Sequence, residues 1–231
     1  DINRDVLRKF LLYLRLEKRL KPSALQVYVR ALKRFLRAID KDDLARTLRY
    51  PKEKQAVYQL PEPELIEKII CELEDLRYKT ILALIYETGA RVSEILNIRR
   101  EDVEESEHGF YRIRIVDSKN GESRYVYVVK YANLLRTYLQ TYSPSGYLFP
   151  SPSKKNAPLH PRNVEKLLKR LSKKYNIRLY PHLLRHLRAT LLVKEGLQER
   201  VIMKLLGHRS EKMMRIYVNL AARDVEEVIL S

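Results

Sequence analysis

The chain has 231 residues, of which 45% are hydrophobic and 32% are charged, a composition typical of a globular protein and not of a disordered one. Its 46 Lys and Arg outnumber 29 Asp and Glu, which leaves a formal net charge of +17 and favours a polyanionic partner such as nucleic acid. The apolar runs are too short to span a bilayer, and a single cysteine excludes disulfides within the chain. We therefore expect a cytoplasmic protein with no membrane partner.

The first fifty residues carry the densest positive charge, with 14 basic and 6 acidic side chains. Apolar residues recur at helical spacing over 6–20 and over 23–39, with a break at Lys21-Pro22. The inward face of the second helix should hold Leu25, Val29, Leu32, Leu36 and Ile39. Four basic residues occupy its other face and are candidates to bind nucleic acid: Arg30, Lys33, Arg34 and Arg37. We interpret residues 1–50 as a helical DNA-binding part and 51–60 as a linker.

Residues 61–231 form the main domain and are mostly helical in pattern. Helices are expected over 63–75, 77–88, 91–98, 162–175, 181–195, 198–206 and 210–219, with a last one near 222–230. The segments 111–115 and 125–129 instead alternate with period two. Asn120-Gly121 is typical of the turn between two such strands, which places Lys119 at the tip of a hairpin. The predicted fold is mainly α with a small antiparallel β-sheet, in the α+β class, and Cys71 is expected in its core.

Several polar residues of this domain could together cleave a phosphodiester bond without a metal. Such a site needs guanidinium groups to neutralise the phosphate, because these present planar, paired donors. Arg91 begins a helix just after Thr88-Gly89, where backbone N–H groups also favour an anion. Arg185 follows His182 by three residues on one helical face, so both side chains can point into one pocket.

The remaining groups could supply a nucleophile and protons. His208 follows Gly207 at a helix end and could hydrogen-bond the same phosphate. Tyr217 falls on the next helix and could deliver a phenolic oxygen, which an arginine-lined pocket would favour as the phenolate. Lys119 at the hairpin tip could protonate the leaving oxygen.

Taken singly, each residue also has an ordinary explanation. An arginine in so basic a chain is usually surface charge, and Tyr217, one of 16 tyrosines, could simply pack in a core. His182 and His186 resemble half of a zinc site, but Leu183 replaces the Glu of that motif. His186 equally fits a packing histidine in a helix interface.

Together, the motifs resemble those of the tyrosine recombinases (phage integrase family), especially the Xer-like branch, over residues 61–231. They read T-G-A-R-V-S-E-I-L, D-S-K-N-G-E-S-R, H-L-L-R-H-L-R-A-T, L-G-H-R-S and R-I-Y-V-N. The resemblance implies a tyrosine recombinase catalytic fold whose catalytic set is Arg91, Lys119, His182, Arg185, His208 and Tyr217. It implies that Glu94 orients catalytic side chains and that His186 lies close to the site without acting in catalysis. It also implies that no metal, cofactor or ATP is needed.

The same resemblance implies a partner and a reaction. The partner is double-stranded DNA, which is cut by the tyrosine to leave a 3′-phosphotyrosyl link and a free 5′-hydroxyl. The short last helix would dock on a neighbouring protomer, giving a homotetramer on DNA and a nucleoid-associated protein. The family carries a four-helix core-binding domain in front, and residues 1–39 look like its last two helices, so we expect a truncated or reduced version of that domain.

Two other functions use similar residues. A DNA-binding module could keep the fold without the chemistry, although the full set of six candidate residues argues against it. A topoisomerase that nicks and religates DNA shares the Tyr, Arg, Lys and His chemistry, but not this spacing of motifs. Among recombinases, resolution of chromosome dimers and integration or excision of mobile elements use the same site, so both stay open.

Overall fold

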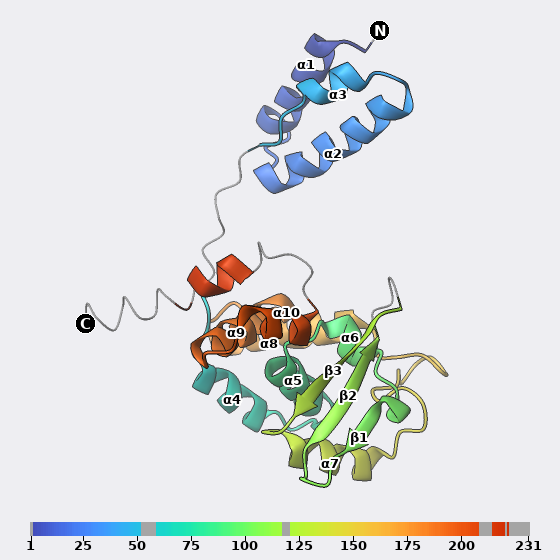
Figure 1. Ribbon diagram of the computed structural model, residues 1–231, viewed down its shortest axis with the longest axis vertical. Coiled ribbons are helices and arrows are strands. Elements are labelled where there is room, and N and C mark those ends of the chain that lie inside the picture. The colour runs from blue at the N-terminus through green and yellow to red at the C-terminus, as the bar shows by residue number, and fades with distance from the viewer. Residues whose placement is uncertain (1, 52–58, 117–120, 208–213, 220, 222–231) are drawn as a thin grey trace, which may run out of the picture. The chain divides into compact units, whose positions relative to one another are not determined.

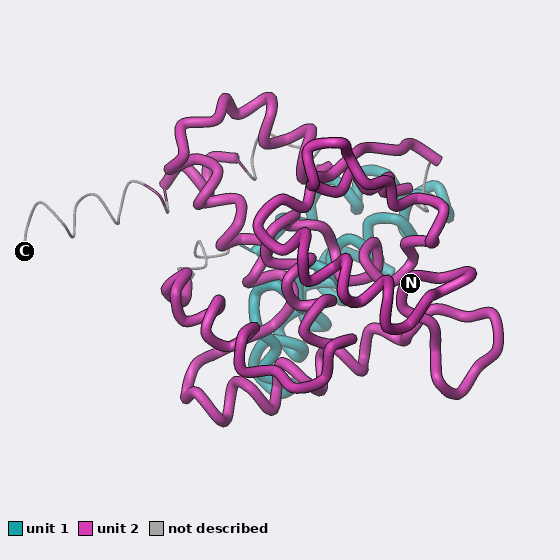
Figure 2. The backbone as a smooth tube through the Cα atoms, turned by 90° about the horizontal axis from the view of Figure 1, so that it is seen from below, with its two compact units in different colours: residues 1–57 teal, residues 58–231 magenta. Residues whose placement is uncertain are grey.

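A computed structural model describes residues 2–51, 59–116, 121–207, 214–219 and 221. The chain divides into two compact units, residues 1–57 and residues 58–231, coloured separately in Figure 2. Most of the predicted linker, the tip of the predicted hairpin and the predicted helix near 222–230 lie outside the described residues. Within the described part, every helix is too short or too polar to cross a membrane.

The first unit consists of α1 (Arg4–Leu16), α2 (Pro22–Ala38) and α3 (Asp42–Thr47), labelled in Figure 1. Helix α1 begins where the Asn3 side chain accepts a hydrogen bond from the Val6 amide at 3.0 Å. Helix α2 begins at Pro22, which has no N–H to leave unsatisfied. Helix α3 is absent from the predicted elements because six residues are too few to reveal a helical period.

The core of the first unit is small. It is formed by apolar residues from all three helices and the segment after them, namely Leu7, Val29, Leu36, Ala45 and Leu48. The prediction that Ile39 points inward is wrong, since this residue ends α2 and is 38% exposed. Other large apolar side chains of this unit are also exposed, among them Phe10, Tyr28 and Phe35.

The second unit holds most of the helices. They are α4 (Pro63–Glu72), α5 (Leu76–Thr88), α6 (Val92–Leu96), α7 (Ala132–Tyr142), α8 (Pro161–Lys174), α9 (Pro181–Lys194) and α10 (Glu199–Leu206). Residues 214–219 are helical as well. Helix α7 is absent from the predicted elements, although Leu135 and Tyr138 follow helical spacing and are buried.

A three-stranded antiparallel sheet lies in this unit, made of β1 (Val103–Glu105), β2 (Tyr111–Val116) and β3 (Ser123–Val128) in that order. A 3₁₀ turn, η1 (Arg100–Asp102), leads into β1. The predicted pairing of β2 with β3 is confirmed, with Ile113 opposite Val126. Strand β1 is absent from the predicted elements because three residues cannot show an alternating pattern. The mainly α fold with a small antiparallel sheet is confirmed.

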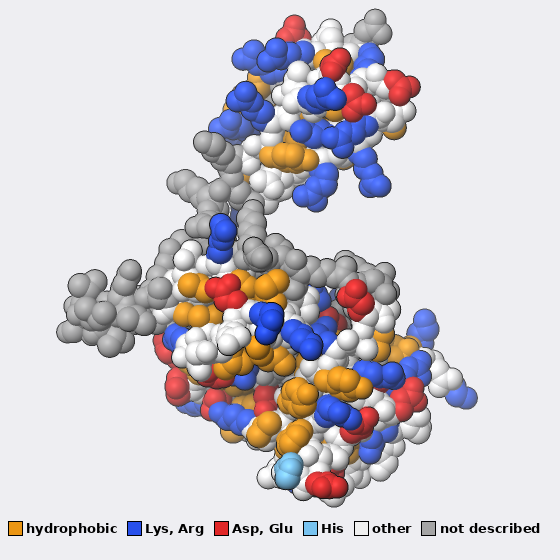
Figure 3. All heavy atoms as spheres, in the orientation of Figure 1, with side chains coloured by type: hydrophobic (Ala, Val, Ile, Leu, Met, Phe, Trp, Pro, Cys, Tyr) orange, Lys and Arg blue, Asp and Glu red, His pale blue; other side chains and the backbone are white. Residues whose placement is uncertain are grey.

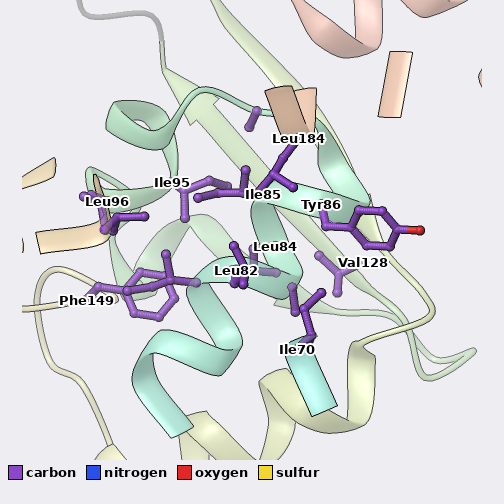
Figure 4. Packing of buried hydrophobic residues seen from close by; sticks show 14 of the residues in the cluster. Ile70, Leu82, Leu84, Ile85, Tyr86, Ile95, Leu96, Val128, Phe149 and Leu184 are labelled. Carbon is purple, nitrogen blue, oxygen red and sulfur yellow. The ribbon is translucent and has the colours of Figure 1, made fainter. Parts of the chain in front are cut away.

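Helix α5 is the centre of the second unit. Its residues 80–86 are all buried, as expected for a helix that is apolar on every side. Figure 4 shows Ile85 among side chains from other elements, such as Val128 of β3 and Leu184 of α9. Helix α4 directs Ile66, Ile69 and Ile70 into the same core. The prediction that Cys71 lies in the core is wrong, because this side chain is exposed. Cys71 follows the buried Ile70, and the rotation of about 100° per residue in a helix turns it towards solvent.

Candidate active site

The end of α5 and the end of α10 meet at one glycine. Gly89 closes α5 in the left-handed conformation, with φ of +63°, which glycine adopts without strain. A Cβ atom at this position would lie only 2.6 Å from the Leu206 side chain. The sequence places Gly89 two residues before Arg91, so this close approach brings the α10 end beside the predicted arginine.

Arg185 of α9 ties these two helix ends together. It is 3% exposed, and its guanidinium donates to the Gly89 carbonyl at 2.7 Å and to the Leu206 carbonyl at 2.6 Å. Both carbonyls belong to helix ends, where backbone acceptors lack helical partners. A buried guanidinium that is held at two points has a fixed direction, as a phosphate-binding group requires.

Arg91 lies at the N-terminus of α6 and is held by Glu94. The Glu94 carboxylate accepts from the Arg91 amide and from Arg91 Nη1, each at 2.7 Å. The Arg91 side chain is 40% exposed, whereas the Glu94 side chain is 8% exposed. Arg91 is therefore open to solvent while its partner Glu94 is covered, and the orienting role of Glu94 stays a prediction.

A third arginine, Arg124 of β3, belongs to the same cluster and is absent from the predicted site. Its two Nη atoms donate to Glu94 at 3.1 and 2.7 Å, and its Nε donates to the Leu205 carbonyl at 2.9 Å. The sequence contains a signal for it. Arg124 lies on the same face of β3 as Val126 and Val128, which are buried, and a cation on a buried face needs an acidic partner.

Burial and neighbouring charges shift the titration of this cluster. Burial alone would raise the pKa of Glu94, but the hydrogen bonds and charge of Arg124, with those of Arg91, hold it below its ordinary value. Burial, with the charge of Arg91 acting in the same direction, lowers the pKa of Arg185 to about 10. At neutral pH Arg185 is therefore a cation and Glu94 a carboxylate, in a cluster that holds three arginines for one glutamate.

The two histidines of α9 differ in their surroundings. His182 is exposed at the first turn of the helix, and partial desolvation and the charges of Arg185 and Arg91 lower its pKa. His186 is buried, and its pKa falls to about 4 through burial and the neighbouring His182 and Arg185. Both imidazoles are neutral at physiological pH, and a neutral imidazole can accept a proton.

Tyr217 packs against α9 and α10 of its own chain. Its side chain is fully buried, in a cluster with Leu192, Ile202 and Met214. Its ring centroid lies 5.6 Å from that of His186, and its phenol is close enough to Arg185 to act on the pKa of that guanidinium. Tyr217 therefore packs against His186, the residue that follows the buried Arg185 on α9.

Two predicted catalytic residues, Lys119 and His208, lie outside the described residues. Their flanking elements do belong to the site. Strand β3, which follows the predicted hairpin tip, carries Arg124, and Gly207 closes α10 directly before residue 208.

The predicted nucleic-acid contacts lie on α2 of the first unit. Arg30, Arg34 and Arg37 are exposed, while Lys33 is half-buried, with its ammonium 4.9 Å from the centre of the Tyr50 ring. Figure 3 shows Lys and Arg side chains spread over the visible face of this unit. The exposed arginines are open to solvent, and their role in binding nucleic acid stays a prediction.

The two histidines of α9, at this spacing, form half of a possible metal site. Among the residues that the structure describes, no group of three or more His, Cys, Asp and Glu is arranged to hold a metal ion.

Comparison with known proteins supports a single family. The model of the phage integrase family matches residues 60–223. The tyrosine recombinase XerA of Pyrococcus furiosus is 32% identical over 231 residues, covering 98% of this chain and 79% of that protein. A crystal structure of XerA recombinase aligns with a TM-score of 0.62 at 25% identity, covering 97% of this chain and 82% of that one. The XerH site-specific recombinase bound to its difH substrate aligns with a TM-score of 0.73 at 25% identity, covering 94% and 67%.

Proposed function

Because the chain belongs to the phage integrase family and is a tyrosine-type site-specific recombinase, we propose that it cuts and rejoins double-stranded DNA in an Xer-like reaction through a 3′-phosphotyrosyl intermediate. Tyr217 is the nucleophile. Arg91 and Arg185 bind the scissile phosphate, and His208 hydrogen-bonds to it. His182 accepts a proton from the nucleophile, and Lys119 donates a proton to the leaving oxygen.

One observation carries the proposal. The buried guanidinium of Arg185 is fixed by the carbonyls of Gly89 and Leu206, within electrostatic range of both Arg91 and Tyr217. Two guanidiniums beside a phenol match the charge of a five-coordinate phosphorus under attack by a tyrosine.

In the first step, the Tyr217 oxygen forms a bond to phosphorus while the bond from phosphorus to the 5′ oxygen breaks. The neutral imidazole of His182 accepts the phenolic proton, and Lys119 donates a proton to the leaving 5′ oxygen. In the second step, a 5′-hydroxyl of the partner strand attacks the same phosphorus and gives its proton to Lys119. The bond from phosphorus to Tyr217 breaks, and the tyrosine regains a proton from His182. Because one phosphodiester replaces another, the exchange needs no ATP.

Tyr217 must move before it reacts. Its fully buried side chain leaves no room for a DNA phosphate beside the phenolic oxygen. We therefore propose that the helical segment 214–219 shifts when DNA is bound, so that a phosphate can enter between the Tyr217 oxygen and the guanidinium of Arg185.

DNA binding is supported by the net charge of +17 and by the exposed arginines of α2. Four protomers on DNA, linked by exchange of the C-terminal residues 222–231, complete the proposed assembly. Those residues lie outside the described part of the chain.

The test is a nicked suicide substrate, from which the short fragment that carries the free 5′-hydroxyl diffuses away so that religation fails. We expect the full chain to form a covalent DNA adduct, and Tyr217→Phe to form none. Tyr142→Phe, a change at an exposed tyrosine of α7, is the matched control and should keep the adduct. Adduct formation by Tyr217→Phe would assign the nucleophile to another residue.

The suicide-substrate assay and a relaxation assay on supercoiled DNA distinguish the other functions. An idle DNA-binding module would bind the substrate without an adduct. A topoisomerase would relax supercoiled DNA without sequence preference, whereas a recombinase should prefer its own site. Comparison of a dimer-resolution site with a mobile-element attachment site then separates the two recombinase roles.

A further inference from the structure

We propose that Arg124 is a positioning residue of this site, which keeps the charge of Arg91 available to the phosphate and holds the C-terminal end of α10 in place. The inference rests on the proposed function. Arg124 lies near the start of β3, and its side chain is 11% exposed. It is therefore a nearly buried cation on the wall of the site, assigned to no role by the sequence motifs.

The first part of the inference concerns Glu94. Its carboxylate accepts four hydrogen bonds, of which two come from Arg91 and two from Arg124. Arg91 uses its backbone amide and only one guanidinium nitrogen for this contact. Arg124 thus occupies the carboxylate positions that the second nitrogen of Arg91 would otherwise take.

The consequence follows from charge. A lone Glu94–Arg91 pair would be neutral, and a phosphate would meet a cation already cancelled by its own partner. With Arg124 present, two cations share one carboxylate, so the group keeps a net positive charge. The carboxylate still orients Arg91, and its charge is offset by a side chain that is itself covered from solvent.

The second part concerns the end of α10. Arg124 Nε donates to the Leu205 carbonyl at 2.9 Å, and Arg185 donates to the next carbonyl, that of Leu206, at 2.6 Å. A Cβ atom on Gly207, where φ is +68°, would lie 2.8 Å from Arg124 Nη1. Two buried guanidiniums thus hold consecutive carbonyls of one helix end, and the chain passes Arg124 closely before it reaches residue 208.

Other arginines on the sheet lack these features. Arg112 of β2 also pairs with a glutamate, Glu104, but both side chains are about half-exposed. Such surface pairs contribute little. Arg112 is therefore a matched control on the same sheet.

The experiment measures the rate of adduct formation on the suicide substrate at saturating DNA, together with the Kd for DNA. Arg124→Gln should slow the adduct by about 100-fold, the usual result of misplacing a reacting group, while Kd changes little. Arg112→Gln should match the wild type. An unchanged rate in Arg124→Gln, or a Kd that worsens as much as the rate, would overturn the inference.

A second variant separates the charge effect from a merely structural one. Adding Glu94→Gln to Arg124→Gln removes the uncompensated carboxylate, so the double variant should be faster than Arg124→Gln alone. A double variant no faster than the single one would contradict the charge argument. If Arg124→Gln shows no cooperative melting transition, Arg124→Lys replaces it in the experiment. A single ammonium cannot hydrogen-bond to both Glu94 and the Leu205 carbonyl. The rate of adduct formation by Arg124→Lys must then fall while its Kd for DNA stays unchanged.

Crystal structures of the wild type and of Arg124→Gln test the inference without an activity measurement. In Arg124→Gln, both guanidinium nitrogens of Arg91 should engage both oxygens of Glu94. An unmoved Arg91 would contradict the inference. If the wild type forms no adduct that depends on Tyr217, the proposed function fails, and this structural comparison still decides the role of Arg124.

Discussion

Arg185 shows how a single residue makes the site rigid. A buried charge is costly unless hydrogen bonds satisfy it, and this guanidinium is satisfied by two backbone carbonyls at 2.7 and 2.6 Å. Both acceptors are neutral, so Arg185 keeps its full charge for a phosphate. Arg91, in contrast, is held by a carboxylate and depends on a second arginine to remain effective.

His186 provides a prediction about stability at the residue scale. Its pKa falls from 6.5 to about 4 in the folded chain, so the unfolded chain binds more protons at acid pH. Protonation of His186 therefore lowers the free energy of unfolding by about 3 kcal/mol. This contribution of the neutral imidazole is fully present above pH 6.5 and is lost as the pH falls through 4. Urea unfolding at a series of pH values should show this loss. His186→Asn should flatten the curve in that range, and an equally steep curve in the variant would refute the assignment.

At the scale of elements, the site depends on where helices end. The last residues of α5 and α10 and the first of α6 meet around Gly89, Leu206 and Arg91, with α9 supplying the arginine that connects them. Helix ends carry unpaired backbone groups, which here bind guanidiniums. Among the described residues, the geometry of the candidate site is therefore set by helix packing.

Gly89→Ala tests this dependence. The left-handed φ of +63° and the 2.6 Å approach to Leu206 should together make the alanine variant less stable by roughly 1–3 kcal/mol, and displacing Leu206 should also slow cleavage. Thermal or urea unfolding measures the first effect. Gly146→Ala is the control, because a Cβ there meets nothing within 4 Å and should change little. Equal effects of the two substitutions would mean that the contact with Leu206 is unimportant.

The elements that the sequence predicts are those with a long, regular pattern. Helices α5 and α9 and the pairing of β2 with β3 follow from periodicity and from the Asn120-Gly121 turn. The elements α3 and β1 are too short to show a period. Arg124 illustrates a different limit, because its partner Glu94 lies 30 residues earlier and only the fold brings the two together. The motifs predict which residues act, whereas the side chains that position them follow from tertiary contacts.

For the whole molecule, charge and chemistry are divided between the two units. The first unit combines a small core with dense positive charge, and the second contains the large core and the candidate catalytic residues. This division suits a protein whose first part binds the DNA backbone while the second part acts on one phosphate.

Salt dependence tests that division. Changing Arg30, Arg34 and Arg37 of α2 to Gln should make the slope of log affinity against log salt shallower by about 3, if each arginine contacts one phosphate. The matched control changes three exposed lysines of α8, Lys166, Lys169 and Lys173, to Gln, which removes the same charge from the other unit. An equal change in both variants would attribute the effect to net charge and not to contacts by α2.

The most direct test of the account is to locate the covalent bond. After reaction with the suicide substrate, nuclease and protease digestion followed by mass spectrometry should find a nucleotide on the peptide that contains Tyr217, joined through a 3′-phosphate. A nucleotide on any other tyrosine, or a product joined through a 5′-phosphate, would contradict the account.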